Sequence, residues 1–412
     1  EVKVKNLQSE GYVKPILRLK PEDHGWERFG EYNDNVFLQP FVEGAWVTKY
    51  KDKYYMQYGA PATEFSGYAD GVYVSKNPLE GYEYQQHNPF SYKPGGFARG
   101  AGHGATFQDN YGNYWHVSTI FISTKNNFER RLGIWPAGFD KDDVMYSNTA
   151  YGDYPTYIPE FANGKDFTKG LFTGWMLLNY QKPVAASSTL GGYQANFAVD
   201  EDIKTYWSAK SGNSGEWFQT DLGEISTINA IQINYADQDA EFMGKTLGKM
   251  HQYKIYSSND GKNWKVLIDK SKNTTDVPHD YIELEKPAKA RFLKMENLKM
   301  PTGKFALSGF RVFGKGGGDK PDKVENFVPL RADPKKFGER RSIWMKWKQN
   351  EKADGYMIYF GKTPDKLYGS IMVYGKNEYF FTGADRTDAY YFQIEAFNNN
   401  GISERSEVFK SE

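Results

Sequence analysis

The stretch that decides the fold reads FVEGAW at residues 41–46 and, after a polar turn at Asp52, KYYMQY at residues 53–58. In the second segment aromatic and apolar side chains recur with a period of two, which is typical of a β-strand. The two segments are therefore predicted to form a β-hairpin with Glu43 at its open end. A carboxyl group flanked by Trp46 and apolar residues suits a general acid, although most glutamates at strand ends are simply solvated.

Three further motifs follow this hairpin in order. They read GVYVSKNP at 71–78, GAGHGATF at 100–107 and DNYGNYWH at 109–116. With this order and spacing the chain resembles glycoside hydrolase family 43, the five-bladed β-propeller arabinanases, arabinofuranosidases and xylosidases. The resemblance implies that Glu43, in E-G-x-W, is the general acid and that His103, in G-x-G-H, lies on the propeller axis. It also implies inverting hydrolysis of glycosidic bonds in a polysaccharide or oligosaccharide.

The two aspartates that enzymes of the resembling family also use are not found. One is the base and the other orients it, and both lie on strands ahead of the E-G-x-W motif. The segment before Glu43 contains Asp23 and Asp34, and neither lies in a matching strand pattern. We therefore expect residues 1–173 to be the later blades of a partial five-bladed propeller, some three blades in all. The missing N-terminal blades are expected from another fragment or chain, because a partial propeller exposes sheet edges.

Five residues besides Glu43 and His103 are candidates for substrate binding. Trp46 follows the acid in its own motif. His24 and Trp26 belong to a polar and aromatic cluster that either lines a pocket or is a loop anchored by a buried tryptophan. Arg130 and Arg131 are a pair that is either solvated or, as the resemblance implies for an arginine of a late blade, in reach of the substrate.

The composition excludes several classes of function. The chain has 52 basic and 52 acidic residues, so no electrostatic footprint for nucleic acid is present. No run of 18 apolar residues exists, so no membrane span is expected. Motifs for nucleotide binding, zinc peptidases and serine hydrolases are also absent from the sequence. The resembling chemistry requires no cofactor.

Aromatic residues make up 17% of the chain, a share that suits β-structure and also suits stacking on sugar rings. The chain contains no cysteine, which is compatible with the cytoplasm and equally with a bacterial secreted, periplasmic or cell-surface protein that relies on its cores. The resemblance favours the latter locations. The opening EVKVK looks like the middle of a strand, so this chain is not expected to contain a signal peptide.

Residues 174–315 resemble the discoidin (coagulation factor 5/8 type C) fold, a β-jelly roll shared with carbohydrate-binding module family 32. The resemblance is carried by segments at 196–200, 205–209, 216–223, 253–264 and 290–295. These segments build the sandwich, whereas ligands bind in variable loops, so the resemblance predicts the fold and leaves the ligand open. The long insertion at 237–245 is interpreted as packing between domains, and the alternative is direct contact with a sugar.

Discoidin domains of that family often hold a calcium ion, and the matching positions here are the Ala198 carbonyl, Asp200, Asp202 and Thr205. These are hard oxygen ligands of the kind that calcium prefers. The glutamate that usually completes the set near the final strand is replaced by Gly309. A structural calcium ion therefore stays an open alternative.

The glycine-rich segment at 316–321 is predicted to be a flexible linker. Beyond it, residues 322–412 show clean strand alternation and resemble a fibronectin type III β-sandwich, with a spacer or docking role. The whole chain is thus predicted to be all-β. Its function is predicted as part of a modular glycoside hydrolase, and the alternative is a non-catalytic glycan-binding protein with a degenerate propeller.

Overall fold

The computed structural model describes residues 15–35, 37–121, 130–159, 171–241, 248–332 and 341–411. Regular structure in these ranges is β-strand, apart from two short 3₁₀ turns, η1 (Gly25–Glu27) and η3 (Ala195–Ala198). The prediction of an all-β protein is confirmed. None of the described segments forms a helix with the length and apolar character needed to cross a membrane.

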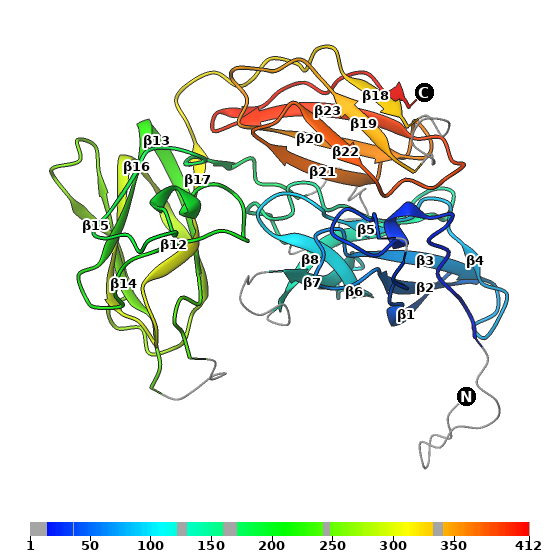
Figure 1. Cartoon of the computed structure of the whole chain (residues 1–412), viewed down its shortest axis with the longest axis horizontal. Coiled ribbons are helices and arrows are strands. Elements are labelled where there is room, and N and C mark those ends of the chain that lie inside the picture. Colours follow the sequence, from blue (N-terminus) through cyan, green and yellow to red (C-terminus); the bar gives the residue numbers. More distant parts are fainter. Residues whose placement is uncertain are drawn as a thin grey trace.

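The first part of the described chain forms one sheet of two antiparallel units (Figure 1). The first unit contains β1 (Glu43–Tyr50), β2 (Lys53–Ala60), β3 (Ala69–Ser75), β4 (Glu83–Tyr84) and β5 (Ser91–Tyr92). The second contains β6 (Arg99–Gln108), β7 (Tyr114–Phe121), β8 (Arg130–Phe139) and β9 (Met145–Ser147). A parallel bridge between Ala69 and Ala101 joins β3 to β6. The predicted hairpin is confirmed as β1 and β2.

Strand β2 shows why the aromatic period of two was a reliable signal. Met56 pairs with Tyr73 and lies on one face, whereas Gln57 pairs with Val72 and lies on the other. Both residues are buried, because the second unit covers one face of the strand and other parts of the chain cover the opposite face. The strand is therefore a central one, as its continuous apolar content requires.

The first part contains fewer antiparallel units than the number of blades that was predicted. Some three blades were predicted, whereas the described residues form two units. The reason lies in residues 148–159, which run as a loop along the third part of the chain. In this loop the Tyr151 hydroxyl donates to Glu395 at 3.0 Å. The segment therefore packs against a neighbour and does not fold into another sheet.

The second part is an eight-stranded sheet system within the described residues. Trp207, Phe218 and Phe310 lie in its core, and all three are fully buried. Strands β13 and β16 are long and contain register shifts, which bend them. The strands are β10 (Met176–Leu177), β11 (Val184–Ala186), β12 (Trp207–Ser208), β13 (Trp217–Tyr235), β14 (Gln252–Ser258), β15 (Lys265–Asp269), β16 (His279–Lys299) and β17 (Ala306–Lys315).

The third part contains two sheets that enclose a core of aromatic residues, among them Trp347 and Tyr356, whose rings lie 4.9 Å apart. One sheet has β18 (Val328–Arg331), β19 (Ile343–Lys346) and β22 (Glu378–Phe381). The other has β20 (Gly355–Gly361), β21 (Gly369–Tyr374), β23 (Tyr391–Asn398), β24 (Gly401–Ile402) and β25 (Phe409–Lys410). Two packed sheets agree with a sandwich, and the fibronectin type III resemblance stays a prediction.

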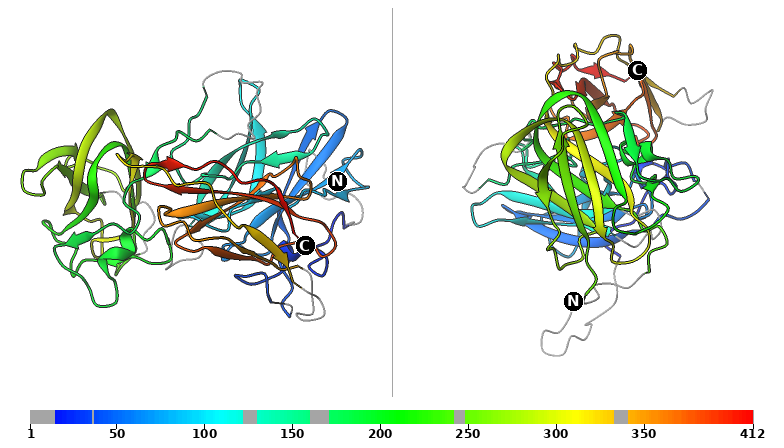
Figure 2. Two further views of the ribbon diagram at one scale, coloured as in Figure 1. Left: turned by 90° about the horizontal axis from the view of Figure 1, so that it is seen from above. Right: turned by 90° about the vertical axis from the view of Figure 1, so that its left-hand side faces the viewer.

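The three parts pack against one another (Figures 1 and 2). The third part lies on the first, and their buried residues form one continuous cluster that includes Trp26, Tyr58, Phe360 and Phe381. A second cluster joins Tyr154, Leu177 and Phe397, which come from all three parts. The apolar residues Met176, Leu177 and Leu178, which follow the connection between the first and second parts, are buried. Burial of such a connection against neighbouring parts keeps its apolar surface away from solvent.

The glycine-rich segment after β17 is held by hydrogen bonds, which differs from the flexible linker that was predicted. The amide of Gly316 donates to the Asn399 carbonyl at 2.9 Å, and the amide of Gly317 donates to Glu224 at 3.0 Å. A Cβ atom on Gly316 would lie 2.2 Å from the Asn400 side chain. The glycines thus permit a close approach of the second and third parts.

A buried ion network joins the second part to the first. Arg311 on β17 is 1% exposed and forms a two-point ion pair with Glu201, with distances of 2.9 and 2.8 Å. Its third nitrogen donates to the carbonyl of Asp153 at 2.6 Å, and Lys93 lies 3.2 Å from the Asp153 carboxylate. Two positive and two negative groups therefore balance inside the junction, and each depends on the others.

We expect Arg311→Met to destabilise the chain by about 3–5 kcal/mol, because it leaves Glu201 buried without its cation. The matched control is Arg291→Met, which breaks a two-point pair with Asp221 at the surface and should cost at most about 1 kcal/mol. Denaturant unfolding followed by tryptophan fluorescence measures both. Equal losses for the two variants would show that the Arg311 network does not hold the junction.

Candidate functional site

Gly44 allows the E-G-x-W and G-x-G-H motifs to lie close together. Glu43 is the first residue of β1, and His103 lies in the middle of β6. A Cβ atom on Gly44 would lie 2.8 Å from the His103 ring, so only glycine lets the two strands approach so closely. His103 has a φ of 51°, and register shifts flank both motifs. Such bulges redirect side chains, and here they turn both toward one point.

Glu43 and His103 form an open polar site with Tyr68. The Tyr68 hydroxyl donates to Glu43 Oε1 at 2.6 Å, and His103 Nδ1 lies 3.5 Å from Glu43 Oε2. The side chains of Glu43 and His103 are 40% and 50% exposed. The carboxyl group can therefore meet a ligand from solvent while the phenol fixes its orientation. Sequence reasoning missed Tyr68.

A buried layer lies beneath this site. Asp70 and His116 are both fully buried, with His116 Nε2 3.1 Å from Asp70 Oδ2. His116 Nδ1 lies 3.1 Å from the Gln57 side-chain nitrogen and 3.1 Å from the Thr106 hydroxyl. Sequence reasoning missed this layer as well. The available signal was a charged residue, Asp70, within the otherwise apolar strand at 69–74.

Trp46 follows Glu43 on β1, and its role in substrate binding stays a prediction. Its indole nitrogen donates to the Thr106 carbonyl at 2.8 Å, and its ring is 44% exposed. Phe41 and Val42, just ahead of Glu43, are also exposed. An apolar rim with an aromatic ring thus adjoins the carboxyl group, which is a suitable surface for the face of a sugar.

The other predicted substrate residues lie in different places. His24 and Trp26 pack at the boundary with the third part, where the His24 ring stacks on Tyr84 at 3.8 Å and His24 Nδ1 lies 3.1 Å from Asp385. Trp26 is fully buried and donates to the Tyr84 hydroxyl. The structure therefore has the loop anchored by a buried tryptophan, and a role for Trp26 in contacting substrate is wrong, because its ring meets no solvent.

The two arginines at the start of β8 lie in different surroundings. The positive charge of Arg130 opposes the rise in the pKa of Tyr68, so its charge is felt at Tyr68. The charge of Arg131 acts instead on His279 of the second part, whose pKa burial and this charge lower to about 4. A role in substrate binding stays a prediction for both arginines.

The predicted calcium loop has been adapted to the junction with the first part. Asp200 accepts hydrogen bonds from the Thr205 hydroxyl and the Asp202 amide, and burial raises its pKa to about 6. Asp202 Oδ1 lies 3.2 Å from Arg99 of the first part. A Cβ atom on Gly309 would lie 2.6 Å from the Phe97 ring, so Phe97 fills the place of a third carboxylate.

This set of donors does not fit a calcium ion well. One carboxylate is paired with an arginine, and the described residues contain no group of three acidic, histidine or cysteine side chains placed for a metal. The Ala198 carbonyl completes the predicted set of Asp200, Asp202 and Thr205, and its role as a ligand stays a prediction. No step of the chemistry below involves a metal at this loop.

The insertion after β13 lies within the second part, so its interpretation as packing between domains is wrong for the described residues. The side-chain oxygen of Gln238 accepts a hydrogen bond from Tyr206 at 2.7 Å, and Asp239 pairs with Lys304. The rings of Tyr193 and Tyr206 stack at 4.7 Å. We call these five residues the Tyr206 cluster. Residues 242–245 of the insertion lie outside the described residues.

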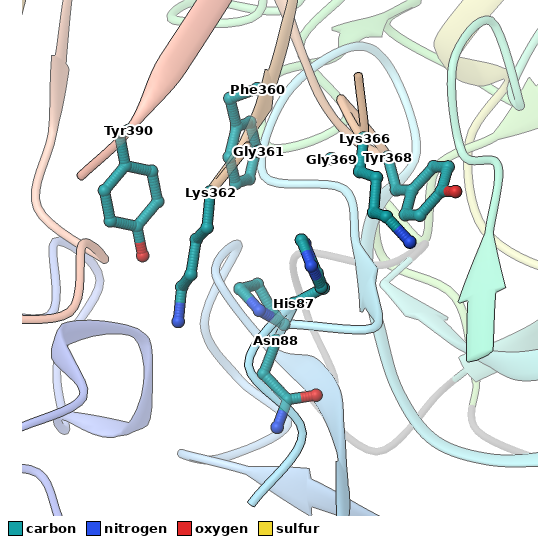
Figure 3. A pocket seen from close by; sticks show the side chains of 10 residues that line it. His87, Asn88, Phe360, Gly361, Lys362, Lys366, Tyr368, Gly369 and Tyr390 are labelled. Carbon is teal, nitrogen blue, oxygen red and sulfur yellow. The ribbon is translucent and has the colours of Figure 1, made fainter. Parts of the chain in front are cut away.

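A small cavity at the boundary of the first and third parts is a different kind of feature (Figure 3). It has about 10 Å³ of accessible space and is lined by His87, Lys362 and Lys366 among others. Burial and the two lysines lower the pKa of His87 to about 4. A space of this size holds one water molecule at most, so it is not a substrate site.

Comparisons with known proteins identify the second part. The family described as F5/8 type C domain matches residues 183–309, so this segment is a discoidin-type domain, as predicted. No curated protein matches the chain. Among solved structures, one described as a glycoside hydrolase is 18% identical over 68% of this chain, with a TM-score of 0.36. The present chain spans 61% of that protein.

Two further solved structures resemble the second part. One is chitosan-binding module 2 of a chitosanase/glucanase from Paenibacillus sp. IK-5, in complex with chitotriose. It is 26% identical, and the match covers 33% of this chain and 99% of that one, with a TM-score of 0.28. The other is the family 32 carbohydrate-binding module of NanJ from C. perfringens, in complex with galactose. It is 18% identical over 34% of this chain and 98% of that one, with a TM-score of 0.28.

Proposed function

We propose that this chain is part of a modular glycoside hydrolase that acts outside the cell, with Glu43 as the general acid and the discoidin-type domain as a carbohydrate-binding module. The observation that carries the proposal is the contact of Glu43 with His103 at 3.5 Å. Glu43 and His103 come from two motifs some sixty residues apart in the sequence. A carboxyl group at the surface, beside an exposed aromatic side chain, is suited to donate a proton to a glycosidic oxygen.

In the proposed reaction Glu43 protonates the oxygen that leaves the sugar. A second carboxylate on the opposite face of the ring activates the attacking water, and the two carboxyl groups stand roughly 6.5–9.5 Å apart in an inverting enzyme. The open side of Glu43 faces solvent, so the sugar can lie between them. The family resemblance favours arabinofuranosides or xylosides.

In this proposal the opposing base comes from another segment. The carboxylate beneath Glu43 is Asp70, which is fully buried and so has no access to a water beside the sugar. The second unit of the first part exposes Phe107, Leu132 and Ile134. An apolar face of this kind fits further propeller blades, which would carry the base and would be a partner of this chain. The test of Glu43 is given in the Discussion.

A non-catalytic glycan-binding protein is the second candidate, and the Tyr206 cluster favours sugar binding in either case. It combines an aromatic ring with amide, carboxylate and ammonium groups, the combination that recognises a sugar face and its hydroxyls. All five residues lie in loops of the discoidin-type domain, where that fold keeps its variable positions.

We expect Tyr206→Ala to weaken sugar binding by about tenfold or more, because it removes a stacking ring and the support of Gln238. The matched control is Tyr256→Ala on β14, which removes a hydroxyl bond to Glu296 on a different strand and should leave affinity unchanged. Calorimetry with galactose and chitotriose as probes measures both variants. If a sugar binds the parent chain and binds Tyr206→Ala with the same affinity, the binding surface lies elsewhere.

A further inference from the structure

The buried layer beneath Glu43 contains a carboxyl group, that of Asp70, which has no role in the proposed reaction. Asp70 is fully buried, and neither of its carboxylate oxygens has a hydrogen-bond partner of good geometry among the described residues. Its neighbour is His116 Nε2 at 3.1 Å. A buried carboxylate left in this state is costly, so a fold that keeps one at the base of a candidate site requires an explanation.

The hydrogen bonds of His116 determine which charge the layer carries. The Gln57 amide nitrogen can only donate, so His116 Nδ1, 3.1 Å away, is the acceptor. The ring proton therefore lies on Nε2, which is 3.1 Å from Asp70 Oδ2 without a hydrogen bond of good geometry. A neutral imidazole beside a carboxylate leaves one negative charge in the layer.

Two glycines bring this charge close to the open site. A Cβ atom on Gly59 would lie 2.8 Å from the Tyr68 hydroxyl, 2.8 Å from the His103 amide nitrogen and 3.3 Å from Asp70 Oδ1. A Cβ atom on Gly104 would lie 2.6 Å from Asp70 Oδ2. The phenol of Tyr68 thus contacts Glu43 and lies near the carboxylate of Asp70.

This position keeps the phenol protonated. Burial raises the pKa of Tyr68 far above its ordinary value, the hydrogen bond to Glu43 and the charge of Asp70 raise it further, and Arg130 opposes them. Tyr68 therefore keeps its proton, which it donates to Glu43 Oε1. Glu43 Oε2, on the side of His103, remains as the oxygen that can carry the transferable proton.

We propose that Tyr68 is a positioning residue for Glu43, and that the buried Asp70 beneath it is a negative charge that disfavours the carboxylate form of Glu43. The inference rests on the proposed role of Glu43 and adds the groups that control when its proton is present. The charged and titratable groups that act on Glu43 or Tyr68 are His103, Asp70 and Arg130.

The two halves of this arrangement predict effects of opposite sign. Tyr68→Phe removes a hydrogen bond that favours the carboxylate form of Glu43, so the titration midpoint of this side chain should rise by about one pH unit. Asp70→Asn keeps the shape but removes a negative charge that disfavours the carboxylate, so the midpoint should fall. A purely structural disturbance would not produce shifts in opposite directions.

The measurement is a ¹³C NMR titration of the full chain labelled at the glutamate side-chain carboxyl, with Glu43→Gln used to assign the resonance. Tyr73→Phe is the matched control, because Tyr73 lies on β3, which begins directly after Tyr68, and its hydroxyl donates to the Arg18 carbonyl at 3.3 Å. We expect the control to leave the midpoint unchanged. An unchanged midpoint in Tyr68→Phe, or an upward shift in Asp70→Asn, overturns the inference.

The titration separates this inference from the function on which it rests. If Glu43 is not the acid, activity survives Glu43→Gln while the midpoint shifts are still observed. If Glu43 is the acid and Tyr68 does not position it, activity falls in Glu43→Gln and the midpoint stays fixed in Tyr68→Phe. In the active enzyme Tyr68→Phe should also move the basic limb of the kcat/KM profile to higher pH by the same amount.

Discussion

Glu43→Gln should lower kcat/KM for oligosaccharides by about 10²–10⁴-fold in the enzyme that also contains the opposing base. The substitution keeps the size of the side chain and its position beside Tyr68 and His103. It removes the proton that the leaving sugar oxygen needs, and an alkoxide leaves poorly without one. Initial rates on natural oligosaccharides measure the loss.

The matched control for this prediction is Glu83→Gln. Glu83 is an exposed glutamate on β4 of the same sheet. It pairs with Val74 at the other end of β3 from Tyr68 and Asp70. The control should keep the full rate. Similar, small losses for both substitutions would mean that Glu43 donates no proton in the reaction.

The 412-residue chain alone should hydrolyse aryl arabinofuranosides and xylosides at least about 10²–10⁴-fold more slowly than it does together with the blades that supply the base. The physical reason is that a general acid without an opposing carboxylate has no activated water on the far face of the sugar. Asp70, the nearest carboxylate below Glu43, is buried and does not supply that water.

Adding the missing blades, as a fused segment or as a separate fragment, should restore activity. An ordinary enzymatic rate from the mass-verified chain by itself would contradict the partial propeller and would place the base within these residues. Asp34 would then be the first candidate, because it is exposed in the loop ahead of β1.

Much of the fold followed from local patterns. The hairpin of β1 and β2 was predicted because its alternation and its polar turn are properties of neighbouring residues. The discoidin-type domain was predicted from motifs that build its own sandwich. The roles of Glu43 and His103 were assigned from a resemblance, and their adjacency was not predicted, since no local pattern in the sequence says that β1 and β6 approach at Gly44.

The features that escaped prediction depend on contacts distant in the sequence. Trp26 became a core residue because the third part, more than three hundred residues later, covers it. Position 309 has no room for a side chain, because the Phe97 ring of the first part occupies the space beside Gly309. Tyr68 is one of 31 tyrosines, and only the bulged strands reveal that its hydroxyl meets Glu43.

The most direct test of Glu43 as the general acid is the dependence of rate on the leaving group, measured with aryl glycosides of graded phenol acidity. The proposed mechanism predicts that Glu43→Gln steepens this dependence, because good phenolate leaving groups need little protonation and poor ones depend on it. The variant should therefore approach the parent rate on the most acidic phenols and fall furthest below it on the least acidic. Parallel lines for the variant and the parent enzyme would contradict the assignment.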